Sequence, residues 1–589
     1  MREDVSRFAT SNSLEAMSLQ ANVIRRIYFQ LRRTLTHKRG LSTKLLFDGA
    51  NQKNGSFENQ ISGFQSLVKR INKPKKRDTK DITSRESILY LELKEFLKQI
   101  SSANNPKIDI EQVVNSDSLI STFLRSHERP RDVICNFQIL YQTVEGDGLG
   151  IIPKSSYAMP YLNDYDDSYE KYSIIKVPKT LIGDNVKVRL MMHHMYYSDS
   201  ELISIDHEGS KRSSRRNDLI ICNKFNECSG CALQMMKYED QLEFKREVIK
   251  KAYKFFYPSL EIASSESFGV VIGSPMQFAY RNKLTPHFNL QKKTLKHDVS
   301  MGFNNVNPTK GIVDIEYCPI ASNIINDHMN TFREQEISLA ENSQPTRKQK
   351  WGHTMLMRES IKVDPSTGHY EEVCLSNPKS VVTVKIGDFV FQFPASEFFQ
   401  NNSHILPYVL DFISTQINDR SQGFKYLIDT YCGSGFFGIS LSRDLIQIGG
   451  KVLGIEISKK SIMYAEHNAK LNGINVPESA EFIEGSADSI FSNAFFNNAN
   501  VKGENSIVII DPSRKGTDLP FIRQLLSFKP KLVFYVSCNV FTQARDLSII
   551  SQLQDEYNAN YKVKKVVGFD FFPQTKHVES VAVLELQVN

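Results

Sequence analysis

Two polar side chains near the C-terminus have the chemistry of a nucleophile and a base. Cys538 ends a β-branched and aromatic run, residues 533–536, and a small polar turn follows it. Glu579 comes 41 residues later in the run FPQTKHVES, where another strand is expected to begin. A thiol at one strand's end and a carboxylate at another strand's start can act as a covalent nucleophile and a proton acceptor. The two residues therefore predict covalent catalysis.

A cofactor-type loop lies upstream of this pair. A buried strand at residues 426–429 runs into the turn TYCGSG, and a helix is expected from about Phe437. A second strand, residues 452–456, ends in Glu456, 27 residues after Asp429. A strand, a glycine turn and a helix open a doubly wound nucleotide-binding fold, and an acid at the second strand's tip can hold ribose hydroxyls. Because the G-x-G-x-x-G of dehydrogenases is absent, S-adenosylmethionine is favoured over NAD.

A third strand, residues 507–510, ends in Asp511 within the run DPSRKG. Ligand sites in doubly wound sheets lie at the carboxyl ends of the strands. Asp429, Glu456, Asp511 and Cys538 are all expected there. The pattern predicts an α/β fold with a Rossmann-like C-terminal domain and one site along the edge of its sheet.

A second group of thiols lies in the middle of the chain. Cys222, Cys228 and Cys231 have the spacing C-x5-C-x2-C, and Cys318, in a Cys-Pro step, is the best candidate for a fourth ligand. Closely spaced thiolates can hold one soft metal centre. The spacing alone leaves an iron–sulfur cluster and zinc equally open, and His207 or His287 could contribute to a zinc site.

The motifs FFQNN, DTYCGSG, GIEIS, DPSRKG, VSCN and HVESV occur in this order. From about residue 131 to the C-terminus the chain resembles the RNA 5-methyluridine methyltransferases, most closely the eukaryotic enzymes for uracil 54 of tRNA. The resemblance implies that Cys538 is the nucleophile, that Glu579 is the base, and that four residues contact S-adenosylmethionine. These four are Gln400, Tyr431, Glu456 and Asp511.

Two details qualify this resemblance. Where many members have a second proline after Asp511-Pro512, this chain has Ser513, which removes no chemical group. The family's bacterial rRNA branch carries a 4Fe-4S cluster with the same cysteine layout, so the resemblance favours iron–sulfur over zinc.

The reaction explains why both residues are needed. Uracil C5 is a poor nucleophile, and thiolate addition at C6 creates an enolate that can take up a methyl group at C5. A base must then remove the C5 proton so that the thiol can leave. Arg514, Lys515 or the sulfonium of the methyl donor would favour the thiolate. The target base must flip out of its stack.

A run that alternates aromatic and basic residues is the candidate RNA contact. Phe278 and Tyr280 could stack on bases while Arg281 and Lys283 meet phosphates. The alternative, in which these residues belong to the core and to ion pairs, stays open.

The rest of the chain predicts several domains. A basic, disordered extension is expected at residues 1–83 and a small helical segment at 84–130, where Leu89, Leu93, Phe96, Leu97 and Ile100 share a face. Residues 131–210 alternate with period two between glycine turns, which indicates an OB-like barrel that resembles the RNA-binding TRAM domain. A central α+β domain with the cysteines (211–390) and the methyltransferase domain (391–589) follow.

The N-terminus leaves the compartment open. Residues 16–47 contain seven Lys and Arg and no acid, as in a mitochondrial transit peptide, although an RNA-binding arm or a start at Met17 fits equally well. A second basic run, residues 69–77, fits a linker best, with a nuclear signal or an RNA contact as alternatives. Mitochondrial and nuclear-cytoplasmic locations are both compatible.

Together these observations predict a tRNA uridine-C5 methyltransferase. An rRNA methyltransferase and a tRNA chaperone are the alternatives. The net charge of +7 fits an acidic partner, here tRNA. No apolar run is long enough for a bilayer, so no membrane partner is expected. We expect a monomer.

Overall fold

The computed structural model describes residues 81–104, 133–153, 172–194, 196–206, 213–290, 299–342, 353–363, 369–418, 423–486, 490–491 and 501–587. The predicted N-terminal signals, the basic run at 69–77 and His207 lie outside these residues. Among the described residues, no helix is both long and apolar enough to span a membrane. The helices are α4 (Arg85–Asn104), α6 (Tyr238–Phe256), α7 (Asn323–Asn342), α8 (Leu406–Asn418), α9 (Phe436–Ser440), α10 (Arg443–Gln447), α11 (Lys459–Leu471), α13 (Leu519–Phe528) and α14 (Val540–Leu553).

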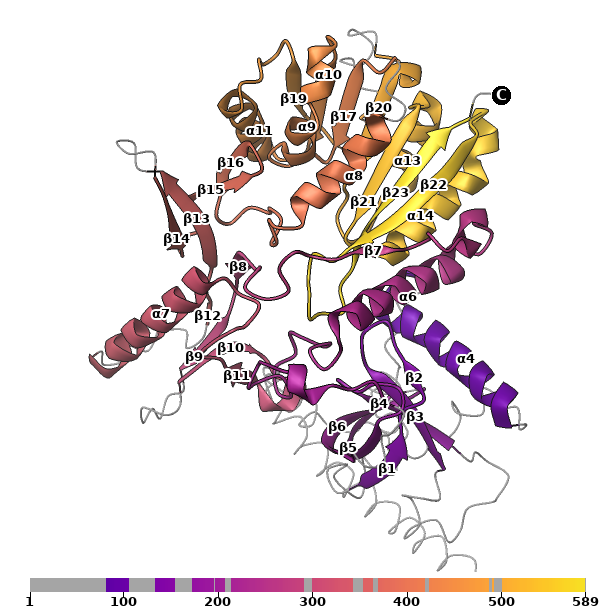
Figure 1. The fold of residues 1–589 in the computed structure, drawn as a ribbon, viewed down its shortest axis with the longest axis vertical. Coiled ribbons are helices and arrows are strands. Elements are labelled where there is room, and N and C mark those ends of the chain that lie inside the picture. The colour runs from indigo at the N-terminus through magenta and orange to yellow at the C-terminus, as the bar shows by residue number, and fades with distance from the viewer. Residues whose placement is uncertain are drawn as a thin grey trace, which may run out of the picture. The chain divides into compact units, whose positions relative to one another are not determined.

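The largest sheet has eight strands in the order β19-β18-β17-β20-β21-β23-β22-β7 (Figure 1). Its strands are β7 (Val271–Ile272), β17 (Tyr426–Thr430), β18 (Lys451–Glu456), β19 (Ala480–Glu484), β20 (Ser506–Ile510), β21 (Leu532–Ser537), β22 (Tyr561–Phe569) and β23 (Glu579–Leu586). The strands β19 to β21 run parallel, and β23 is antiparallel to both neighbours. The predicted strands at 426–429, 452–456, 507–510 and 533–536 are confirmed. The order reverses at β17, which places a ligand crevice at the carboxyl ends of the central strands.

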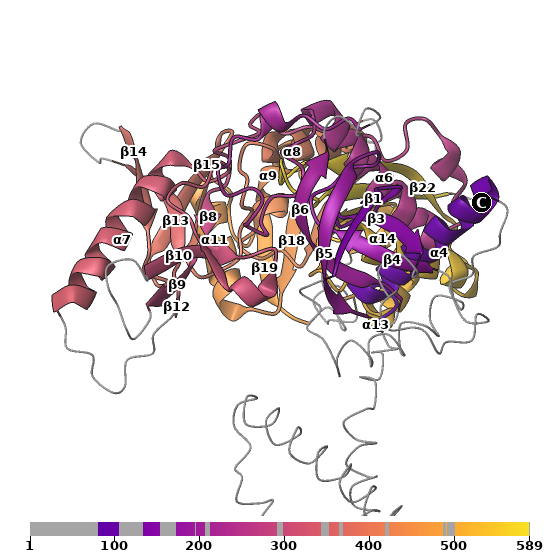
Figure 2. The same ribbon diagram turned by 90° about the horizontal axis from the view of Figure 1, so that it is seen from below.

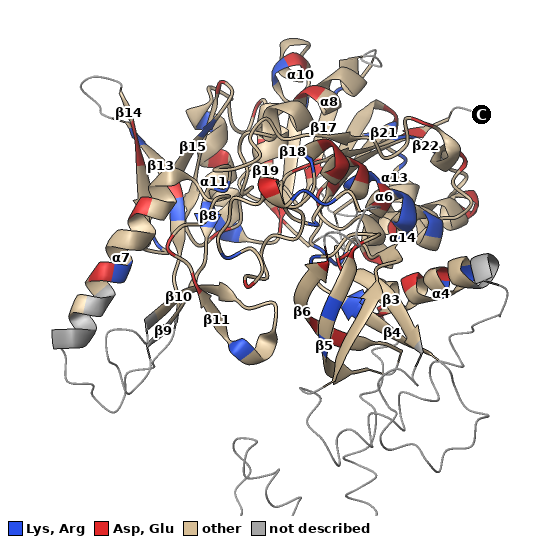
Figure 3. Cartoon of the chain, turned by 60° about the horizontal axis from the view of Figure 1, so that its bottom comes forward, with Lys and Arg blue, Asp and Glu red and all other residues tan. Residues whose placement is uncertain are grey.

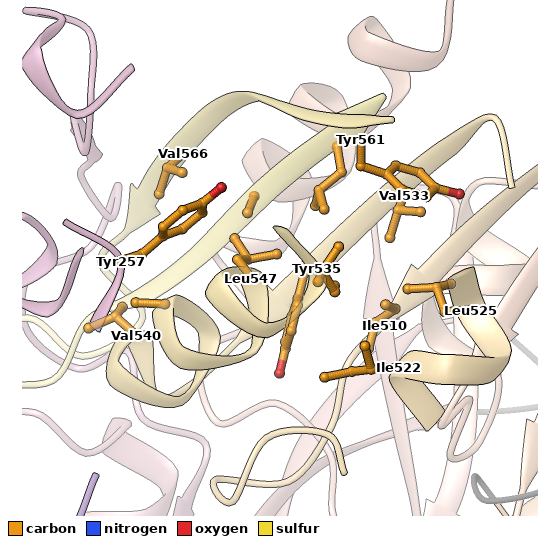
Figure 4. Packing of buried hydrophobic residues seen from close by; sticks show 14 of the residues in the cluster. Tyr257, Ile510, Ile522, Leu525, Val533, Tyr535, Val540, Leu547, Tyr561 and Val566 are labelled. Atoms are coloured by element: carbon orange, nitrogen blue, oxygen red, sulfur yellow. The ribbon is translucent and has the colours of Figure 1, made fainter. Parts of the chain in front are cut away.

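Both faces of this sheet are covered, as runs rich in β-branched residues require. Val533 and Tyr535 of β21 pack on one face, while Phe534 and Val536 belong to the core of the other face. On the first face, Ile522 of α13 and Leu547 of α14 complete the layer (Figure 4). Burial of both faces gives the central strands a stable register, and the site at their ends depends on it.

Part of the central region belongs to the catalytic sheet. Strand β7 pairs with β22 through Gly568 and Phe569, and Val248 and Ile249 of α6 share a core with the sheet. Strand β7 and helix α6, which lie in the predicted central domain, therefore contribute to the sheet and the core of the catalytic region. A helical pattern shows that a helix has an apolar face, but does not show which sheet that face covers.

A six-stranded sheet occupies the predicted barrel region, in the order β1-β5-β6-β4-β3-β2. Its strands are β1 (Ile134–Gln138), β2 (Tyr141–Gln142), β3 (Gly148–Pro153), β4 (Tyr172–Val177), β5 (Asn185–His193) and β6 (Ser198–Asp206). The amide of Leu140, just after β1, donates to Leu149 of β3, so the sheet curls back toward its first strand (Figure 2). Val186, Val188 and Leu190 face inward, as their alternation predicted.

Helix α4 lies within the predicted helical segment, of which residues 105–130 are outside the described residues. Leu93, Phe96, Leu97 and Ile100 are buried against Tyr141, Leu149 and Ile174 of the curled sheet, with Leu89 partly buried beside them. The buried carboxylate of Glu92 accepts from Lys251 of α6 at 3.0 Å and from the amide of Val144 at 2.9 Å. Helix α4 therefore contacts both the curled sheet and the catalytic layer.

Smaller sheets lie between these regions. Their strands are β8 (Lys283–Leu284), β9 (His287–Leu290), β10 (Val299–Asn304), β11 (Ile312–Asp314), β12 (His353–Thr354), β13 (Met357–Val363), β14 (Tyr370–Leu375), β15 (Val381–Ile386) and β16 (Phe389–Pro394). They form sheets ordered β11-β10-β9-β12 and β14-β13-β8 and a hairpin of β15 and β16. Helix α7 packs with them around Met301 and Met357.

Candidate active site

The strand register places Cys538 and Glu579 opposite each other. Strands β21 and β23 are antiparallel, with Ser537 facing Ser580. Cys538 is the next residue after β21, and Glu579 is the first residue of β23. Continuation of the ladder by one residue brings the thiol and the carboxylate to the same place. The pair predicted from sequence is thus brought together by sheet hydrogen bonds.

Burial shapes the electrostatics of this pair. Glu579 is 6% exposed, and burial together with nearby Asp511 raises its pKa to about 8, against the opposing effect of Arg514. Burial, Glu579 and Asp511 likewise raise the pKa of the Cys538 thiol to about 12. Arg514 lowers the pKa of the thiol, as expected from sequence, but burial and the two acids outweigh it. The site therefore has too little positive charge to ionise the thiol by itself.

Two more buried acids continue this row. Burial, and then the charge of Asp429, raises the pKa of Asp511 to about 7. Burial raises the pKa of Asp429 to about 7 as well, although the amide of Gly438 donates to one carboxylate oxygen at 2.9 Å. Its other oxygen is buried and has no hydrogen-bond partner. Acids crowded in this way suit a cationic ligand, and a sulfonium is one.

The glycine turn after β17 is held against the second strand. The amides of Tyr431 and Cys432 both donate to the carbonyl of Ile455 at 2.9 Å. Tyr431 has φ 87°, an unfavourable value for a side chain of this size, and Gly433 and Gly435 also have positive φ. Strain of this kind persists where the surrounding structure imposes it, often at ligand sites.

Glu456 faces this turn from the tip of β18. Its two carboxylate oxygens accept from the amides of Gly433 at 3.3 Å and Ser458 at 3.0 Å. These bonds orient the carboxylate and leave lone pairs for two ribose hydroxyls. With the glycine turn and the unpaired oxygen of Asp429, the site fits the adenosyl part and the sulfonium of S-adenosylmethionine.

Gln400 lies in the loop that follows β16. Phe399, its neighbour, packs against Phe436 of α9, with ring centroids 5.7 Å apart. Arg358 is 1% exposed and donates to the carbonyls of Glu397 at 3.0 Å and Phe399 at 3.3 Å. The sequence analysis missed Arg358, because nothing in its surrounding run distinguishes it from a surface arginine on a strand. It holds the FFQNN loop in place.

The loops that carry Arg514 and Cys538 are tied to each other. The carbonyl of Arg514 accepts from the side-chain amide of Asn539 at 2.9 Å. Asn539 also caps α14, since its side chain accepts from the amide of Phe541. The residue next to the nucleophile therefore sets the start of a helix and the place of Arg514.

The four predicted metal-ligating thiols are free cysteines that lie near one another. Cys231 is close enough to Cys318 and Cys228 for their charges to raise its pKa, and Cys222 acts on Cys228 and Cys318 in the same way. Within the described ranges, however, no three His, Cys, Asp or Glu side chains meet in an arrangement ready to hold a metal. His287, the described zinc alternative, pairs its ring nitrogen Nδ1 with the hydroxyl of Thr354 at 3.2 Å.

A buried cation lies beside these cysteines. Lys179 is 5% exposed and donates to the carbonyls of Phe225 and Cys228. The amide of Gly230 also donates to Sγ of Cys228 at 3.4 Å. A cation and an N–H···S contact suit a centre with negatively charged sulfur. The cation and the N–H···S contact are thus compatible with a soft metal centre. The four thiols themselves are not arranged around a common metal position.

Of the four predicted RNA contacts, Tyr280 is buried, while Phe278, Arg281 and Lys283 are partly exposed. Tyr280 is 1% exposed and donates its hydroxyl to the carbonyl of Pro573 at 3.0 Å, so its ring is not free to stack on a base. It is a core residue here, because the alternating pattern does not distinguish an inner face from an outer one. Phe278 is half-buried. Arg281 lies over the ring of Phe572, 5.7 Å from its centroid.

Lys283 lies in β8, and Figure 3 shows Lys and Arg in blue on the ribbon beside that strand. Burial and the charges of Arg358 and Arg281 lower its pKa to about 8, and only Glu397 opposes them. Cations that repel one another suit an anionic ligand such as a phosphate.

Fold and site together define a methyltransferase of the S-adenosylmethionine-dependent class. A family profile described as tRNA (Uracil-5-)-methyltransferase matches residues 371–587. The tRNA (uracil(54)-C(5))-methyltransferase of Saccharomyces cerevisiae is 32% identical over 576 residues, which cover 88% of this chain and 84% of that protein. The Schizosaccharomyces pombe protein of the same name is 34% identical over 83% of this chain and 84% of its own length. The chain therefore belongs to the tRNA (uracil-5-)-methyltransferase family.

A solved structure supports the fold over most of the chain. The tRNA (uracil-54, C5)-methyltransferase of Pyrococcus abyssi, in complex with S-adenosyl-L-homocysteine, matches with a TM-score of 0.52 and 23% identity. The match covers 76% of this chain and all of that one.

Proposed function

We propose that this protein methylates C5 of uridine 54 in tRNA, with S-adenosylmethionine as methyl donor. The observation that carries the proposal is the register of β21 and β23, which sets the Cys538 thiol opposite the Glu579 carboxylate. The two yeast relatives are named for this reaction at this position.

Cys538 acts first in the proposed reaction. Its thiolate adds to C6 of the uracil, and the resulting electron density at C5 forms the new carbon–carbon bond. The donor, held by Tyr431 and Glu456, would supply an electrophilic methyl group, and the sulfur would leave as the neutral thioether S-adenosylhomocysteine when its bond to that methyl group breaks. Because the pKa of the thiol is raised to about 12 in the free protein, ionisation needs added positive charge, which Arg514 supplies in part.

Glu579 acts second. Its carboxylate takes the proton from C5, the C5=C6 double bond re-forms, the bond from C6 to sulfur breaks, and the thiolate of Cys538 leaves. A carboxylate with a pKa near 8 is a stronger base than an ordinary glutamate. Burial thus prepares Glu579 to remove a carbon-bound proton.

The cofactor roles follow the strand ends. Glu456 holds the ribose hydroxyls, Tyr431 lies along the adenosyl moiety, and Gln400 and Asp511 hold the polar groups near the methyl donor. Tyr431, Glu456 and Asp511 lie at the carboxyl ends of β17, β18 and β20, which supports their roles, and the role of Gln400 rests on the motif resemblance.

The other regions serve the RNA and the fold. Residues 131–210 form a TRAM-type RNA-binding barrel, followed by a central region (211–390) and a catalytic region (391–589). Arg281 and Lys283 contact phosphates. Cys222, Cys228, Cys231 and Cys318 hold a 4Fe-4S cluster, with zinc as the competing centre, and its role is structural because methyl transfer moves no electron.

Purified protein with S-adenosylmethionine and unmodified tRNA tests the activity. We expect 5-methyluridine at position 54 and at no other uridine, and none with tRNA that carries cytidine there. Mapping of 5-methyluridine in tRNA and rRNA from cells that lack the protein separates the alternatives. Loss of an rRNA mark alone would refute the tRNA assignment. Normal tRNA maturation with unmethylated uridine in cells that carry only Cys538→Ala would leave binding as the main role.

A further inference from the structure

The segment that leads into the catalytic base is held by an unusual number of contacts. It connects β22 to β23 and comprises residues 570–578. Phe569, at its start, pairs with Glu579, at its end. Figure 1 shows this connection as a yellow loop that leaves the sheet beside α6. Since Glu579 is the first residue of its strand, the path of the connection decides how its backbone enters the site.

Side chains of helix α6 bind the start of the connection. The buried ammonium of Lys245 pairs with the carboxylate of Asp570 and donates to the carbonyl of Phe572 at 3.0 Å. The hydroxyl of Tyr238 donates to the same carboxylate at 2.9 Å.

Gln574, in the middle of the connection, is hydrogen-bonded to two distant segments. The side chain of Gln241 binds both its side chain and its backbone: Nε2 of Gln241 donates to Oε1 of Gln574 at 3.0 Å, and the backbone N–H of Gln574 donates to Oε1 of Gln241 at 3.0 Å. Its carbonyl accepts from the amides of Ala232 and Leu233, each at 3.0 Å. Gln574 is 3% exposed and has φ 69°.

A glutamine in the left-handed region is uncommon, and such a conformation persists where its surroundings impose it. Here the surroundings are α6 on one side and the cysteine loop on the other, because Ala232 directly follows Cys231. Further along, Lys576 pairs with Glu145 of the turn that precedes β3. Elements far apart in sequence thus determine the entry of the chain into Glu579.

We propose that Gln574 is a positioning residue for the catalytic base, and that through it α6 and the cysteine loop set the place of Glu579. The proposal rests on the proposed function, because it gives Glu579 the role of base. The step it affects is proton removal from C5 with loss of the thiolate, and not the earlier addition of the thiol to C6.

The test measures the two steps separately in Gln574→Ala, with full-length protein and tRNA. Covalent protein–tRNA adduct, seen on a denaturing gel, reports thiol addition, and release of methylated tRNA reports proton removal. We expect adduct formation within twofold of the wild-type rate and release slowed about tenfold to a hundredfold, so that adduct accumulates. Gln552→Ala, on the exposed face of α14, is the matched control and should change neither rate.

A second variant separates side-chain contacts from backbone strain. Glycine accepts φ 69° without strain. Gln574→Gly therefore removes the side-chain amide but keeps the backbone conformation. Release should be slow in both variants. A normal release rate in Gln574→Gly would mean that strain alone caused the defect of Gln574→Ala, and the positioning role would be refuted.

The pH profile gives a readout that general loss of structure would not move. In the wild type, release should rise with pH up to the raised pKa of Glu579. Looser positioning admits water, so in Gln574→Ala this limb should shift toward acid. If the rising part of the pH profile is not shifted, and adduct formation and product release are slowed equally, the proposal is refuted. Absence of methylation in the wild type would instead refute the proposed function.

Discussion

Two thiol sites in this protein are built in opposite ways. Cys538 lies at a strand end among acids, where Glu579 and Asp511 raise the pKa of its thiol. The four central cysteines come from loops, and the buried ammonium of Lys179 interacts with three of them, Cys222, Cys228 and Cys231. Strand ends have a register imposed by the sheet, whereas loops need an added centre to hold them. A cationic ligand would favour the thiolate of Cys538, and the proposed metal centre would fix the positions of the cysteine loops.

Removal of the nucleophile should have the largest effect. Cys538→Ala should lower methyl transfer by about 10⁴-fold or more and abolish the covalent adduct, since alanine has no nucleophile to add to C6. Transfer of labelled methyl groups to tRNA measures this loss. Cys374→Ala, in β14 outside both sites, is the matched control and should keep activity. Adduct formation by Cys538→Ala would exclude this thiol as the nucleophile.

Loss of the base should have a smaller effect than loss of the nucleophile, and it should act on a later step of the reaction. Glu579→Gln should slow product release by about 10²- to 10⁴-fold, because an amide cannot accept the C5 proton. The adduct should accumulate, which a denaturing gel detects. Release at the normal rate would remove Glu579 from the mechanism.

Disruption of the cysteine site should have a weaker effect on catalysis. Cys231→Ser should reduce bound iron and sulfide in anaerobically purified protein and slow release about tenfold, because Ala232 next to it holds Gln574. Elemental analysis and adduct kinetics measure the two effects. Stoichiometric zinc without sulfide in the wild type would refute the cluster and leave the zinc centre.

Neutralisation of a phosphate contact should act on binding alone. Lys283→Met should weaken tRNA binding up to about tenfold and lower the slope of log affinity against log salt by about one. A salt titration of tRNA affinity measures this, with Lys562→Met on β22 as the control. An unchanged salt slope would mean that Lys283 does not meet a phosphate.

The smallest effect concerns stability. Because the pKa of Glu579 is raised from 4.5 to about 8, the folded state binds a proton more tightly than the unfolded state between these pH values. Stability from this group is therefore present below pH 4.5 and lost as the pH rises toward 8. Glu579→Gln should raise the free energy of unfolding at pH 8 by about 1–3 kcal/mol and leave it unchanged near pH 4. Denaturant titrations at both pH values measure the difference, and equal gains at both would contradict a buried carboxylate.

Local patterns predicted the elements of the catalytic sheet well. The strands that lead to Glu456, Asp511 and Cys538 have buried runs of β-branched residues, and the helix around Leu93 has a clear apolar face. Such runs depend on neighbours in sequence, so they can be read from sequence alone. Tyr280, Arg358 and the strand β7 were not predictable in this way, because their partners lie far away in sequence: Arg358 binds carbonyls about 40 residues on, and Tyr280 and β7 meet residues near the C-terminus.

The sequence by itself determined the chemistry: a thiol, a carboxylate, a glycine turn and the acids at strand ends, each in the motif order of the family. Only the tertiary structure decided which groups act on one another. It set Glu579 opposite Cys538 through the β21–β23 register, raised the pKa of both, and tied the segment before Glu579 to α6 and the cysteine loop through Gln574. Residue types define what a side chain can do, but register, burial and long-range hydrogen bonds set its neighbours and its charge state.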